Sequence, residues 1–551
     1  MPQIKLEHVT RRWGGFYGVD DLSMTIDDNA FVTLLGPSGC GKTTTLRMIA
    51  GLETPTSGRI TIGDQVVFDS SAGINVPANK RRVGFLFQNY ALWPNMTVYK
   101  NIAFGLANVK EDLPTIDEKA QRAAGMLRAL GKPRTLRDHV LDARGKKGGL
   151  DTARACLRLI DAYEVSMSSA KELVGLGVHT ASDPDSVAKA AAARYSQTLD
   201  AARAARTAAG ETLTDDFQVV GRDGAVRSTL RKLSSEEIDL RVRRVGRIVK
   251  VGQFMDRYPS ELSGGQQQRV AIARTLAPEP GVLFMDEPLS NLDAKLRLGM
   301  RAELQRLHID TGSTFVYVTH DQMEAMTLAT RICLMDNGVL QQYEEPLTVY
   351  SRPANLFVAD FVGNPSINFI DAAPLPSQEG TLPLAILGGA ATVGFRASES
   401  FDPAASAAHE ARLDEEAAAA ERARQQQKGA VAKENKQSRF RYHVATVEDV
   451  VPEADEVESD DDGGYVLGVR PEFVAVSEQG MFEAEVYSSM PAGMETTLRV
   501  RVGDFLLTSV MFGGPVHQIG QRVRVDLTGD AVMLFSRASG RLVAQGTLEA
   551  L

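Results

Sequence analysis

Apolar and polar positions in the first hundred residues follow the two periods that strands and helices produce. The run Phe31–Leu35 is almost continuously apolar and stands directly before a glycine-rich turn, which predicts a short buried strand. An amphipathic pattern then runs from Thr44 to Ile49, which predicts a helix. A second block in the same style predicts a helix at Gln267–Leu276, a strand at Val282–Met285, a helix at Lys295–His308 and a strand at Thr314–Thr319. Strands that alternate with helices predict an α/β fold with a parallel sheet covered on both faces.

The segment 110–232, between these blocks, has a different pattern. It is rich in alanine and arginine, and 11 of the 22 residues at 188–209 are alanine. Because alanine has the strongest intrinsic preference for helix, we expect a helical segment with a loose stretch around Gly145–Gly149. A later biased tract at 404–437 predicts either a solvated helix or disorder, and the acidic run Glu453–Asp462 behind it favours a flexible tether.

Short alternating strands return from Tyr465 onward, with glycine-containing turns between them. Examples are Phe482–Val486, Thr497–Val502 and Arg522–Leu527. Regularly spaced short strands of this kind predict a small β-barrel in the last part of the chain.

Composition narrows the class of protein. The chain has 551 residues, which is enough for two or three domains, and 43% apolar and 24% charged residues are typical of soluble globular proteins. A net charge of −9 argues against binding to nucleic-acid phosphates. The three cysteines, Cys40, Cys156 and Cys333, are too few for a disulfide scaffold and favour a reducing compartment. No apolar run reaches the about 18 residues of a membrane span, and the first residues alternate as a strand without a charged leader, so we expect a soluble, intracellular protein.

The strongest chemical signal is the segment Gly36-Pro-Ser-Gly-Cys-Gly41-Lys42-Thr43, which we call the glycine loop. It fits the pattern G-x-x-x-x-G-K-[ST] between a predicted strand and a predicted helix. Glycines let backbone N–H groups point at phosphates, and the N-terminus of the following helix adds positive potential. In this pattern Lys42 reaches the β- and γ-phosphates and Thr43 holds Mg²⁺. The loop therefore predicts a nucleotide-phosphate site.

Two adjacent carboxylates, Asp286 and Glu287, follow the predicted strand Val282–Met285. The carboxyl ends of strands are where ligands gather in an open parallel sheet. Asp286 suits a contact with Mg²⁺, and Glu287 suits a general base for water. An apolar run that ends in two carboxylates is by itself more often a solvated strand end, but its combination with the glycine loop favours phosphate chemistry.

Further motifs stand in a fixed order along the chain. They are Trp13 in RRWGG, Gln88 in LFQNYALWP, LSGGQ at Leu262–Gln266, SNLD at Ser290–Asp293, and His320 after the last predicted strand of the second block. Together with the glycine loop and the carboxylates, this order resembles the ATP-binding subunit of an ABC transporter. The resemblance implies that Trp13 stacks on adenine, that Gln88 links the site to a membrane partner, and that His320 senses the γ-phosphate.

The resemblance also implies a full set of site residues. Glu287 would activate water, and His320 and Gln88 would complete the catalytic group. The ligands of Mg²⁺ would be Thr43, Gln88 and Asp286. ATP would be contacted by Trp13, Gly36, Pro37, Ser38, Gly39, Cys40, Gly41, Lys42, Thr43, Thr44, Ser263, Gly264, Gly265, Gln266 and Asp293.

The resemblance implies an assembly as well. Two nucleotide domains, in a homodimer or a heterodimer with a close relative, would hold each ATP between the glycine loop of one copy and LSGGQ of the other. Ser263 and Gly265 would then contact the γ-phosphate in trans. The dimer would sit on two membrane-spanning permease subunits, peripherally at the cytoplasmic face of the cell membrane, and would serve an extracytoplasmic solute-binding protein. Its activity would be ATP hydrolysis that drives transport, without nucleic acid as a partner.

Residues 1–106 and 234–363 resemble the ATPases of carbohydrate importers of the maltose and multiple-sugar type. The similar segments include GPSGCGKTTTLRMIAGLE, YPSELSGGQQQRVAIARTL and MDEPLSNLDAKLR. Importers of polyamines, iron, sulfate or glycerol phosphate share most of these segments, so they remain alternatives. A soluble ABC-type ATPase without a membrane partner is an alternative of another class.

The segment Leu467–Glu472 (LGVRPE) resembles a strand of the family's C-terminal regulatory domain, an oligonucleotide-fold barrel. In some relatives this domain binds a regulatory protein. We interpret Arg470 and Glu472 as a structural ion pair or as caps of the barrel end, with a ligand-binding pair as the alternative.

The resemblance divides the chain into three predicted domains. A nucleotide-binding α/β domain with an antiparallel β edge would occupy 1–106 and 234–343, a helical insertion 107–233 within the helical subdomain, and a C-terminal β-barrel domain 344–551, interrupted by the tract 404–437. The insertion is unusual for the family, and Ser234 behind it fits the N-cap of a helix. We expect the insertion to project outward and to leave the ATP site intact, with gating of the coupling to the membrane subunits or binding of another partner as the alternatives.

Overall fold

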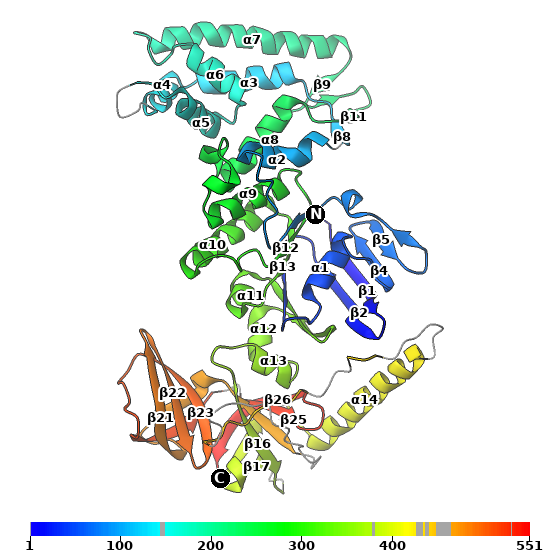
Figure 1. Cartoon of the computed structure of the whole chain (residues 1–551), viewed down its shortest axis with the longest axis vertical. Helices are drawn as coiled ribbons and strands as arrows, with labels where there is room; N and C mark the ends of the chain where they lie inside the picture. The colour runs from blue at the N-terminus through cyan, green and yellow to red at the C-terminus, as the bar shows by residue number, and fades with distance from the viewer. Residues whose placement is uncertain are drawn as a thin grey trace. The chain divides into compact units, whose positions relative to one another are not determined.

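The computed structural model describes residues 2–108, 110–143, 149–376, 381–425, 433–435, 440–447, 464–529 and 532–551. Within these ranges the chain divides into two compact units, whose elements are labelled in Figure 1. We call residues 82–315 the central unit and residues 2–81 together with 316–551 the terminal unit.

An antiparallel sheet with the strand order β2-β1-β4-β5-β6 opens the terminal unit, as predicted for the β edge. The strands are β1 (Ile4–Trp13), β2 (Phe16–Ile26), β4 (Ser57–Ile62), β5 (Gln65–Asp69) and β6 (Ile74–Asn75). In this unit, β3 (Phe31–Leu35) has the predicted bounds and all five of its residues are buried. It pairs in parallel with β14 (Arg331–Asp336), which pairs antiparallel with β15 (Val339–Glu344).

Four helices complete this part of the terminal unit. They are α1 (Lys42–Ala50), α11 (Gln322–Leu328), α12 (Pro346–Ser351) and α13 (Leu356–Phe361). The predicted helix at 44–49 is thus confirmed as α1, which begins two residues earlier because the helix starts inside the glycine loop motif. Val349 and Val358 of the last two helices pack in one buried cluster with Leu35, Ile332 and Leu334.

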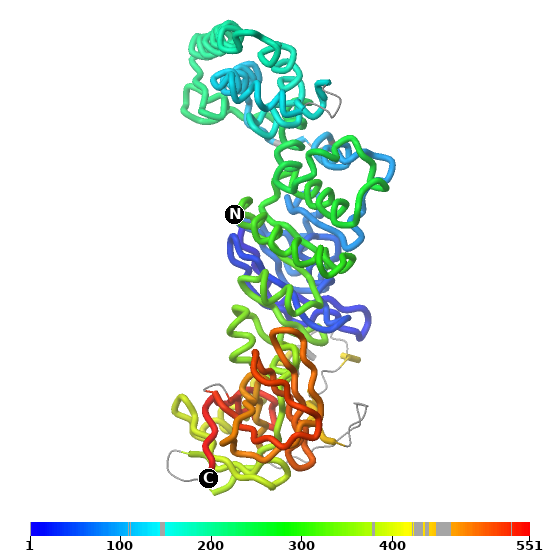
Figure 2. Tube along the Cα trace, turned by 90° about the vertical axis from the view of Figure 1, so that its left-hand side faces the viewer, coloured from blue at the N-terminus to red at the C-terminus, as the bar shows by residue number. Residues whose placement is uncertain are grey.

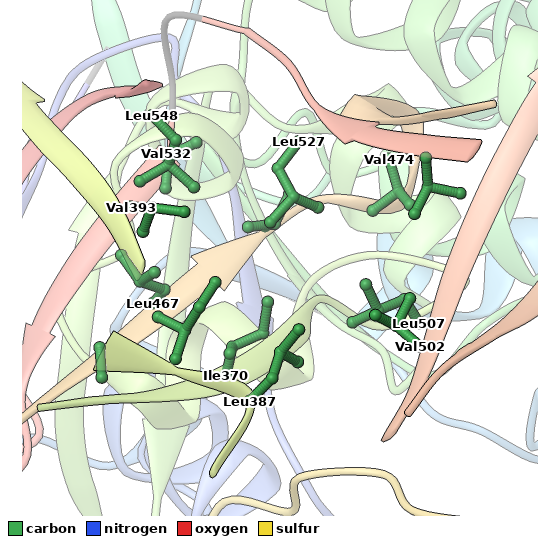
Figure 3. Close-up of a cluster of buried hydrophobic side chains, with 14 of the residues drawn as sticks. Ile370, Leu387, Val393, Leu467, Val474, Val502, Leu507, Leu527, Val532 and Leu548 are labelled. Atoms are coloured by element: carbon green, nitrogen blue, oxygen red, sulfur yellow. The ribbon is translucent and has the colours of Figure 1, made fainter. Parts of the chain in front are cut away.

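A closed antiparallel barrel in the last part of the chain confirms the predicted barrel fold. Its strands, in order, are β16 (Asn368–Pro374), β17 (Leu382–Ile386), β18 (Ala391–Ala397), β26 (Leu542–Ala550), β25 (Val532–Ser536) and β19 (Tyr465–Val469). A second, five-stranded antiparallel sheet contains β20 (Val474–Ser477), β24 (Arg522–Leu527), β21 (Phe482–Ala492), β22 (Glu495–Val502) and β23 (Phe505–Phe512). Figure 3 shows that residues of both, such as Leu467 and Val502, share one apolar core.

The three example strands at 482–486, 497–502 and 522–527 exist, but they lie in the five-stranded sheet and not in the closed barrel. The barrel takes its strands from 368–397, 465–469 and 532–550. An alternating pattern specifies which side of a strand is buried and leaves the partner strand open, so this division could not be predicted from the pattern.

The central unit contains the second predicted block. Its parallel strand pair is β12 (Val282–Asp286) with β7 (Val83–Leu86), and its helices outside the insertion are α2 (Val98–Asn108), α8 (Ser235–Ile248), α9 (Gly264–Leu276) and α10 (Ala294–Thr311). Helix α2 packs against α8 and α9. The predicted elements at 267–276, 282–285 and 295–308 are confirmed as α9, β12 and α10, and the predicted strand at 314–319 as β13 (Thr314–Val318).

The insertion is helical, as the alanine-rich composition predicts. Its helices, coloured cyan to blue-green in Figures 1 and 2, are α3 (Glu118–Leu130), α4 (Pro133–Leu141), α5 (Thr152–Tyr163), α6 (Met167–Gly175) and α7 (Pro184–Ala208). They enclose a core of their own that includes Met126, Leu159, Leu173 and Tyr195. Of the predicted loose stretch at Gly145–Gly149, residues 145–148 lie outside the described residues.

Two antiparallel ribbons in the insertion were not predicted. In one, β8 (Glu111–Pro114) pairs with β11 (Ser228–Arg231), so the strands that enter and leave the insertion lie side by side. In the other, β9 (Thr212–Leu213) pairs with β10 (Val219–Val220). Ser234 caps the next helix, α8, as predicted, and the side chain of Glu237 accepts from the backbone N–H of Ser234.

The tract 404–437 contains a solvated helix, α14 (Pro403–Gln425), which decides between the two predicted alternatives for that stretch. The acidic run at 453–462 lies outside the described residues. Short 3₁₀ turns occur at Ala78–Lys80, Gly252–Phe254, Pro259–Glu261, Leu387–Gly389 and Pro471–Phe473. No helix in the described ranges combines the length and the apolar character needed to cross a bilayer.

Candidate nucleotide-binding site

The glycine loop follows β3 and leads into α1, as the motif predicts. Gly36 has φ 147° and Gly41 has φ 104°, a backbone region that other residues rarely adopt. A Cβ at Gly36 would collide with the carbonyl oxygen of Met335, and a Cβ at Gly41 with that of Gly18. Both positions therefore require glycine, and the loop is held close to the end of β14 and to the start of β2.

The ammonium group of Lys42 lies over the loop. Its Nζ donates to the carbonyl oxygens of Gly36 and Pro37, both at 2.7 Å, and the residue is only 6% exposed. Thr43 and Thr44 follow in the first turn of α1 and are half-buried. A buried cation beside a helix N-terminus is suited to an anion of high charge, because both contribute positive potential. Burial raises the pKa of the Cys40 thiol, which stays neutral beside this cation.

Trp13 lies beside the glycine loop, at the end of β1. Its ring packs against Gly18, whose backbone in turn contacts Gly41. The indole is 46% exposed, lies 6.4 Å from the ring of Phe16, and carries the Arg11 guanidinium 4.8 Å from its centroid. An aromatic ring that is half exposed next to a phosphate loop is available to stack on a base.

Gln88 and Glu287, which are far apart in the sequence, meet in the central unit. The Nε2 of Gln88 donates to the Oε2 of Glu287 over 3.0 Å. Asp286, at the end of β12, is 5% exposed. Glu287 has φ 44°, and a left-handed backbone in a residue of this type persists only where its surroundings hold it. The surroundings include Ser290, whose Oγ donates to the carbonyl of Glu287 over 2.9 Å.

Two residues that position this pair were not predicted. Asn291 donates from Nδ2 to the carbonyl of Gln88 over 3.0 Å. Arg274, on α9, donates to the carbonyls of Ala91 and Tyr90 at 2.6 and 2.8 Å, and burial lowers its pKa. Both side chains act on backbone carbonyls across the fold, so neither has a sequence spacing by which it could be recognised. Asn291 does lie within the SNLD motif, which was the available signal.

The LSGGQ motif forms the start of α9. Ser263 is the N-cap, and its N–H donates to the Oε1 of Gln266 over 3.0 Å. Ser263 and Gly264 are exposed, whereas Gly265 is buried. Asp293 is the N-cap of α10 and accepts from the N–H of Leu296 over 2.9 Å, so its carboxylate has a structural role. The exposed start of α9 has backbone N–H groups that can bind an anion.

His320 lies two residues after the end of β13 and is exposed. The residue before it, Thr319, donates from its N–H to the carbonyl of Leu34 over 3.3 Å, which fixes the backbone close to β3. Within the terminal unit the structure thus gathers Trp13, the glycine loop and Thr44 around β3, with His320 on the adjoining segment. Within the central unit it brings Gln88 and Glu287 into contact, and places Asp286, Asp293 and LSGGQ on the neighbouring elements.

Arg470 is structural, as we interpreted it, but its partners are carbonyl groups. The side chain is 1% exposed and donates to the carbonyls of Ala359, Val362 and Tyr350, while the guanidinium carbon lies 4.1 Å from the Tyr350 ring centroid. Glu472 accepts from the hydroxyl of Tyr350 over 2.7 Å. Arg470 therefore caps α13, and its link to Glu472 runs through Tyr350.

Comparison with known proteins identifies the family of the chain. The sequence profile described as ABC transporter matches residues 19–152 and 188–290. The trehalose/maltose import ATP-binding protein of Thermococcus litoralis is 37% identical over 372 residues, which cover 68% of this chain and 67% of that protein. The xylose/arabinose import ATP-binding protein of Haloferax volcanii is 37% identical over 370 residues, covering 67% and 63%. The osmoprotective compounds uptake ATP-binding protein of Synechocystis sp. is 33% identical over 388 residues, covering 70% and 71%.

These matches confirm the resemblance that the motifs indicated. The profile is interrupted at 153–187, inside the insertion, and covers both the glycine loop and the carboxylate pair. Since the relatives are matched over about two thirds of their length at more than 30% identity, the chain belongs to the ABC transporter family, among its ATP-binding proteins.

Proposed function

We propose that this chain energises the import of carbohydrates or related polyhydroxylated solutes, as one half of an ATP-driven dimer on two membrane subunits. As an ATP-binding protein of the ABC transporter family, the chain is an ATP-hydrolysing transport enzyme. The observation that carries the catalytic part of the proposal is the hydrogen bond between Gln88 and Glu287, next to Asp286 at the end of β12. It is the arrangement needed to orient a base toward water.

The proposed chemistry begins with Lys42. Its ammonium would exchange the carbonyls of Gly36 and Pro37 for phosphate oxygens, which carry more negative charge. The Thr43 hydroxyl, the Asp286 carboxylate and the Oε1 of Gln88 are oxygen ligands of the kind that Mg²⁺ prefers. When bound, Mg²⁺ would neutralise charge on the phosphates. Gln88 can interact with Glu287 and with Mg²⁺ together, because its Nε2 donates to Glu287 and its Oε1 remains available as a ligand atom.

Glu287 would take a proton from the attacking water, while His320 contacts the γ-phosphate. Ser263 and Gly265 would contact the γ-phosphate of an ATP held by a second copy of the chain. Ser263 and Gly264 are exposed at the start of α9, where backbone N–H groups can receive an anion. The γ-phosphate would hold the two copies together, and its hydrolysis would release them. Two residues from one copy and the glycine loop from the other would thus complete one site.

The solute class is inferred from the relatives. Their names specify trehalose and maltose, xylose and arabinose, and osmoprotective compounds. The first four are sugars, which carry several hydroxyl groups, so we extend this solute class to the chain. An extracytoplasmic binding protein and the membrane subunits would recognise the solute.

An exposed aromatic patch supports a partner in the membrane. Phe87, Trp93 and Phe104 are 37%, 48% and 41% exposed, and the rings of the last two lie 5.5 Å apart. Asn101 is fully buried and donates to the carbonyls of Trp93, Met96 and Thr97, so the loop under the patch is held rigid. Exposed aromatic side chains on the segment that follows Gln88 and on α2 are suited to receive a helix of a permease at the cytoplasmic face.

Two measurements test the proposal. Glu287→Gln should lower ATP hydrolysis by about 10²- to 10⁴-fold while ATP still binds, with Glu495→Gln, at an exposed position of the five-stranded sheet, as the control. Tagged protein purified from solubilised membranes should bring sugar-type permeases with it. Permeases for polyamines, iron, sulfate or glycerol phosphate would contradict the solute class, and recovery of no membrane protein would favour a soluble ATPase.

A further inference from the structure

Residues 433–435, from the biased tract 404–437, contact the β1–β2 hairpin that carries Trp13. The carboxamide of Asn435 pairs with both backbone groups of Tyr17: the N–H of Tyr17 donates to Oδ1, and Nδ2 donates to the carbonyl, each over 2.8 Å. Strand β2 is at the edge of its sheet, so this carboxamide takes the place that a neighbouring strand would occupy. The pairing therefore fixes the backbone at the start of β2.

Lys433 makes a second contact with the hairpin. Its Nζ lies 2.8 Å from the Oδ2 of Asp20, and the two side chains are only 18% and 8% exposed. The same ammonium lies 5.9 Å from the ring centroid of Tyr17. Because both charges are largely removed from water, each depends on the other for its solvation.

Asp20 connects this ion pair to the glycine loop. Its N–H donates to the carbonyl of Gly338 over 2.8 Å, and the N–H of Gly338 donates to the carbonyl of Cys40 over 3.1 Å. Both bonds are made by backbone groups, so the glycine loop keeps them when the Lys433 side chain is removed.

Glu434 contacts the turn of the hairpin. Its N–H donates to the carbonyl of Gly15 over 2.9 Å, and its side chain packs so closely on Gly15 that a Cβ there would lie 2.5 Å from Oε1. Gly15 and Tyr17 flank Phe16, whose ring stacks beside Trp13. Residues 433–435 therefore hold the hairpin on both sides of Phe16, the ring that stacks beside Trp13.

We propose that Lys433 and Asn435 are positioning residues of the nucleotide site, which hold the hairpin so that Trp13 presents its ring to the adenine base. The inference rests on the proposed function, in which Trp13 stacks on adenine. It assigns a role in base affinity to Lys433 and Asn435, although both lie more than 400 residues from Trp13 in the sequence.

The same segment is tied to the C-terminal barrel. Phe440 comes five positions after Asn435 and packs edge-on against Phe357 at 5.6 Å. Tyr442 donates its hydroxyl to Asp371 of β16 over 2.6 Å. A hairpin held from this segment is therefore linked to the barrel by a short stretch of chain.

The test uses the full chain and Trp13 as its own probe. The chain has two tryptophans, so Trp93→Phe leaves Trp13 as the only indole. In this background we would measure binding of ATP, and of inorganic tripolyphosphate, which has the phosphates without the base. Asn435→Ala and Lys433→Ala should weaken ATP by about fivefold or more and shift the Trp13 emission, with tripolyphosphate unchanged within about twofold.

Three further variants decide what a result means. Lys433→Arg keeps the charge opposite Asp20 and should restore ATP affinity, while Arg412→Ala, on the exposed helix α14 of the same tract, should have no effect. An equal loss of ATP and tripolyphosphate binding, or no loss of either, would overturn the inference. Trp13→Ala distinguishes failure of the proposed function of Trp13 from failure of the positioning role. If Trp13→Ala leaves ATP binding unchanged, the proposed stacking of Trp13 on adenine is wrong. If it weakens ATP binding while Asn435→Ala does not, only the positioning role is wrong.

Discussion

Replacing Gln88 by alanine tests the hydrogen bond on which the proposed chemistry depends. In the structure its Nε2 donates to the Oε2 of Glu287 over 3.0 Å. The backbone of Glu287 would stay in place, because Ser290 still donates to its carbonyl. The carboxylate, however, would be free to rotate away from the direction in which it receives a proton.

The expected size of the effect follows from this contact. A hydrogen bond to a charged group contributes about 1.5–3 kcal/mol to stability. Gln88 is exposed, so water replaces part of the bond, and we expect about 1–2 kcal/mol of lost orientation. Since about 1.4 kcal/mol in a barrier is a factor of ten in rate, kcat should fall about 5- to 30-fold.

The assay is steady-state ATP hydrolysis at saturating ATP and Mg²⁺, with Gln3→Ala at an exposed position as the control. The decisive comparison includes Glu287→Gln and the double variant. If Gln88 acts through Glu287, the double variant should be no slower than Glu287→Gln alone. A wild-type kcat in Gln88→Ala, or losses that multiply in the double variant, would refute the reasoning.

Three other changes test other parts of the structure. Lys42→Ala should weaken ATP binding by about tenfold or more, measured by titration against Lys5→Ala on the exposed side of β1, because it removes the buried cation of the glycine loop. Arg470→Ala should lower the free energy of unfolding in urea by about 3–5 kcal/mol, since three buried carbonyls lose their donor, and Arg470→Lys should lie in between. Burial raises the pKa of Glu237, but its bonds to Arg231 and to the Ser234 N–H lower it more, so the net pKa is below normal. A carboxyl whose pKa is lower in the folded protein stabilises the fold at pH above about 4.3, and this stabilisation is lost as the pH falls through the folded pKa. The stability of the wild type should therefore fall more steeply below about pH 4 than that of Glu237→Gln.

Local patterns predicted most of the nucleotide-binding elements, because their determinants are neighbours in the sequence. The glycine loop needs glycine where a Cβ would meet the backbone of Gly18 or Met335, and the motif records that requirement directly. The capping of α8 by Ser234 likewise depends on four consecutive residues. Each of these elements can therefore be predicted from a short stretch of the sequence alone.

Contacts between distant segments could not be predicted, because a local pattern records only residues that are neighbours in the sequence. Asn435 meets Tyr17 across 418 positions, and a carboxamide that pairs with a backbone has no spacing that marks it. The two sheets of the C-terminal region share one core, so their strands have the same alternating pattern whichever sheet they join. The ribbon of β8 and β11 was missed because each strand is only four residues long and its partner lies at the other end of the insertion.

That ribbon gives a last prediction, in which the insertion is removed. Pro114 of β8 and Ser228 of β11 face each other in the antiparallel register, so replacing residues 115–227 by Asn-Gly should close a two-residue hairpin. The core of the insertion is its own, and its link to α8 includes polar contacts such as Ser166 to Glu236 at 2.7 Å. Arg231, whose Nη atoms lie 2.6 and 2.7 Å from the carboxylate of Glu237, would remain to fix the hairpin to α8.

We therefore expect the shortened chain to fold and to hydrolyse ATP within about threefold of the full rate, because a surface loop can be shortened at modest entropic cost. The measurements are the far-ultraviolet circular dichroism, the urea unfolding transition and the ATP turnover of the purified protein. A control that removes residues 115–231 takes away Arg231 as well, and it should be less stable. If the first deletion unfolds or loses turnover, then the insertion supports α8, and through it α9 with the LSGGQ motif, and is part of the catalytic fold.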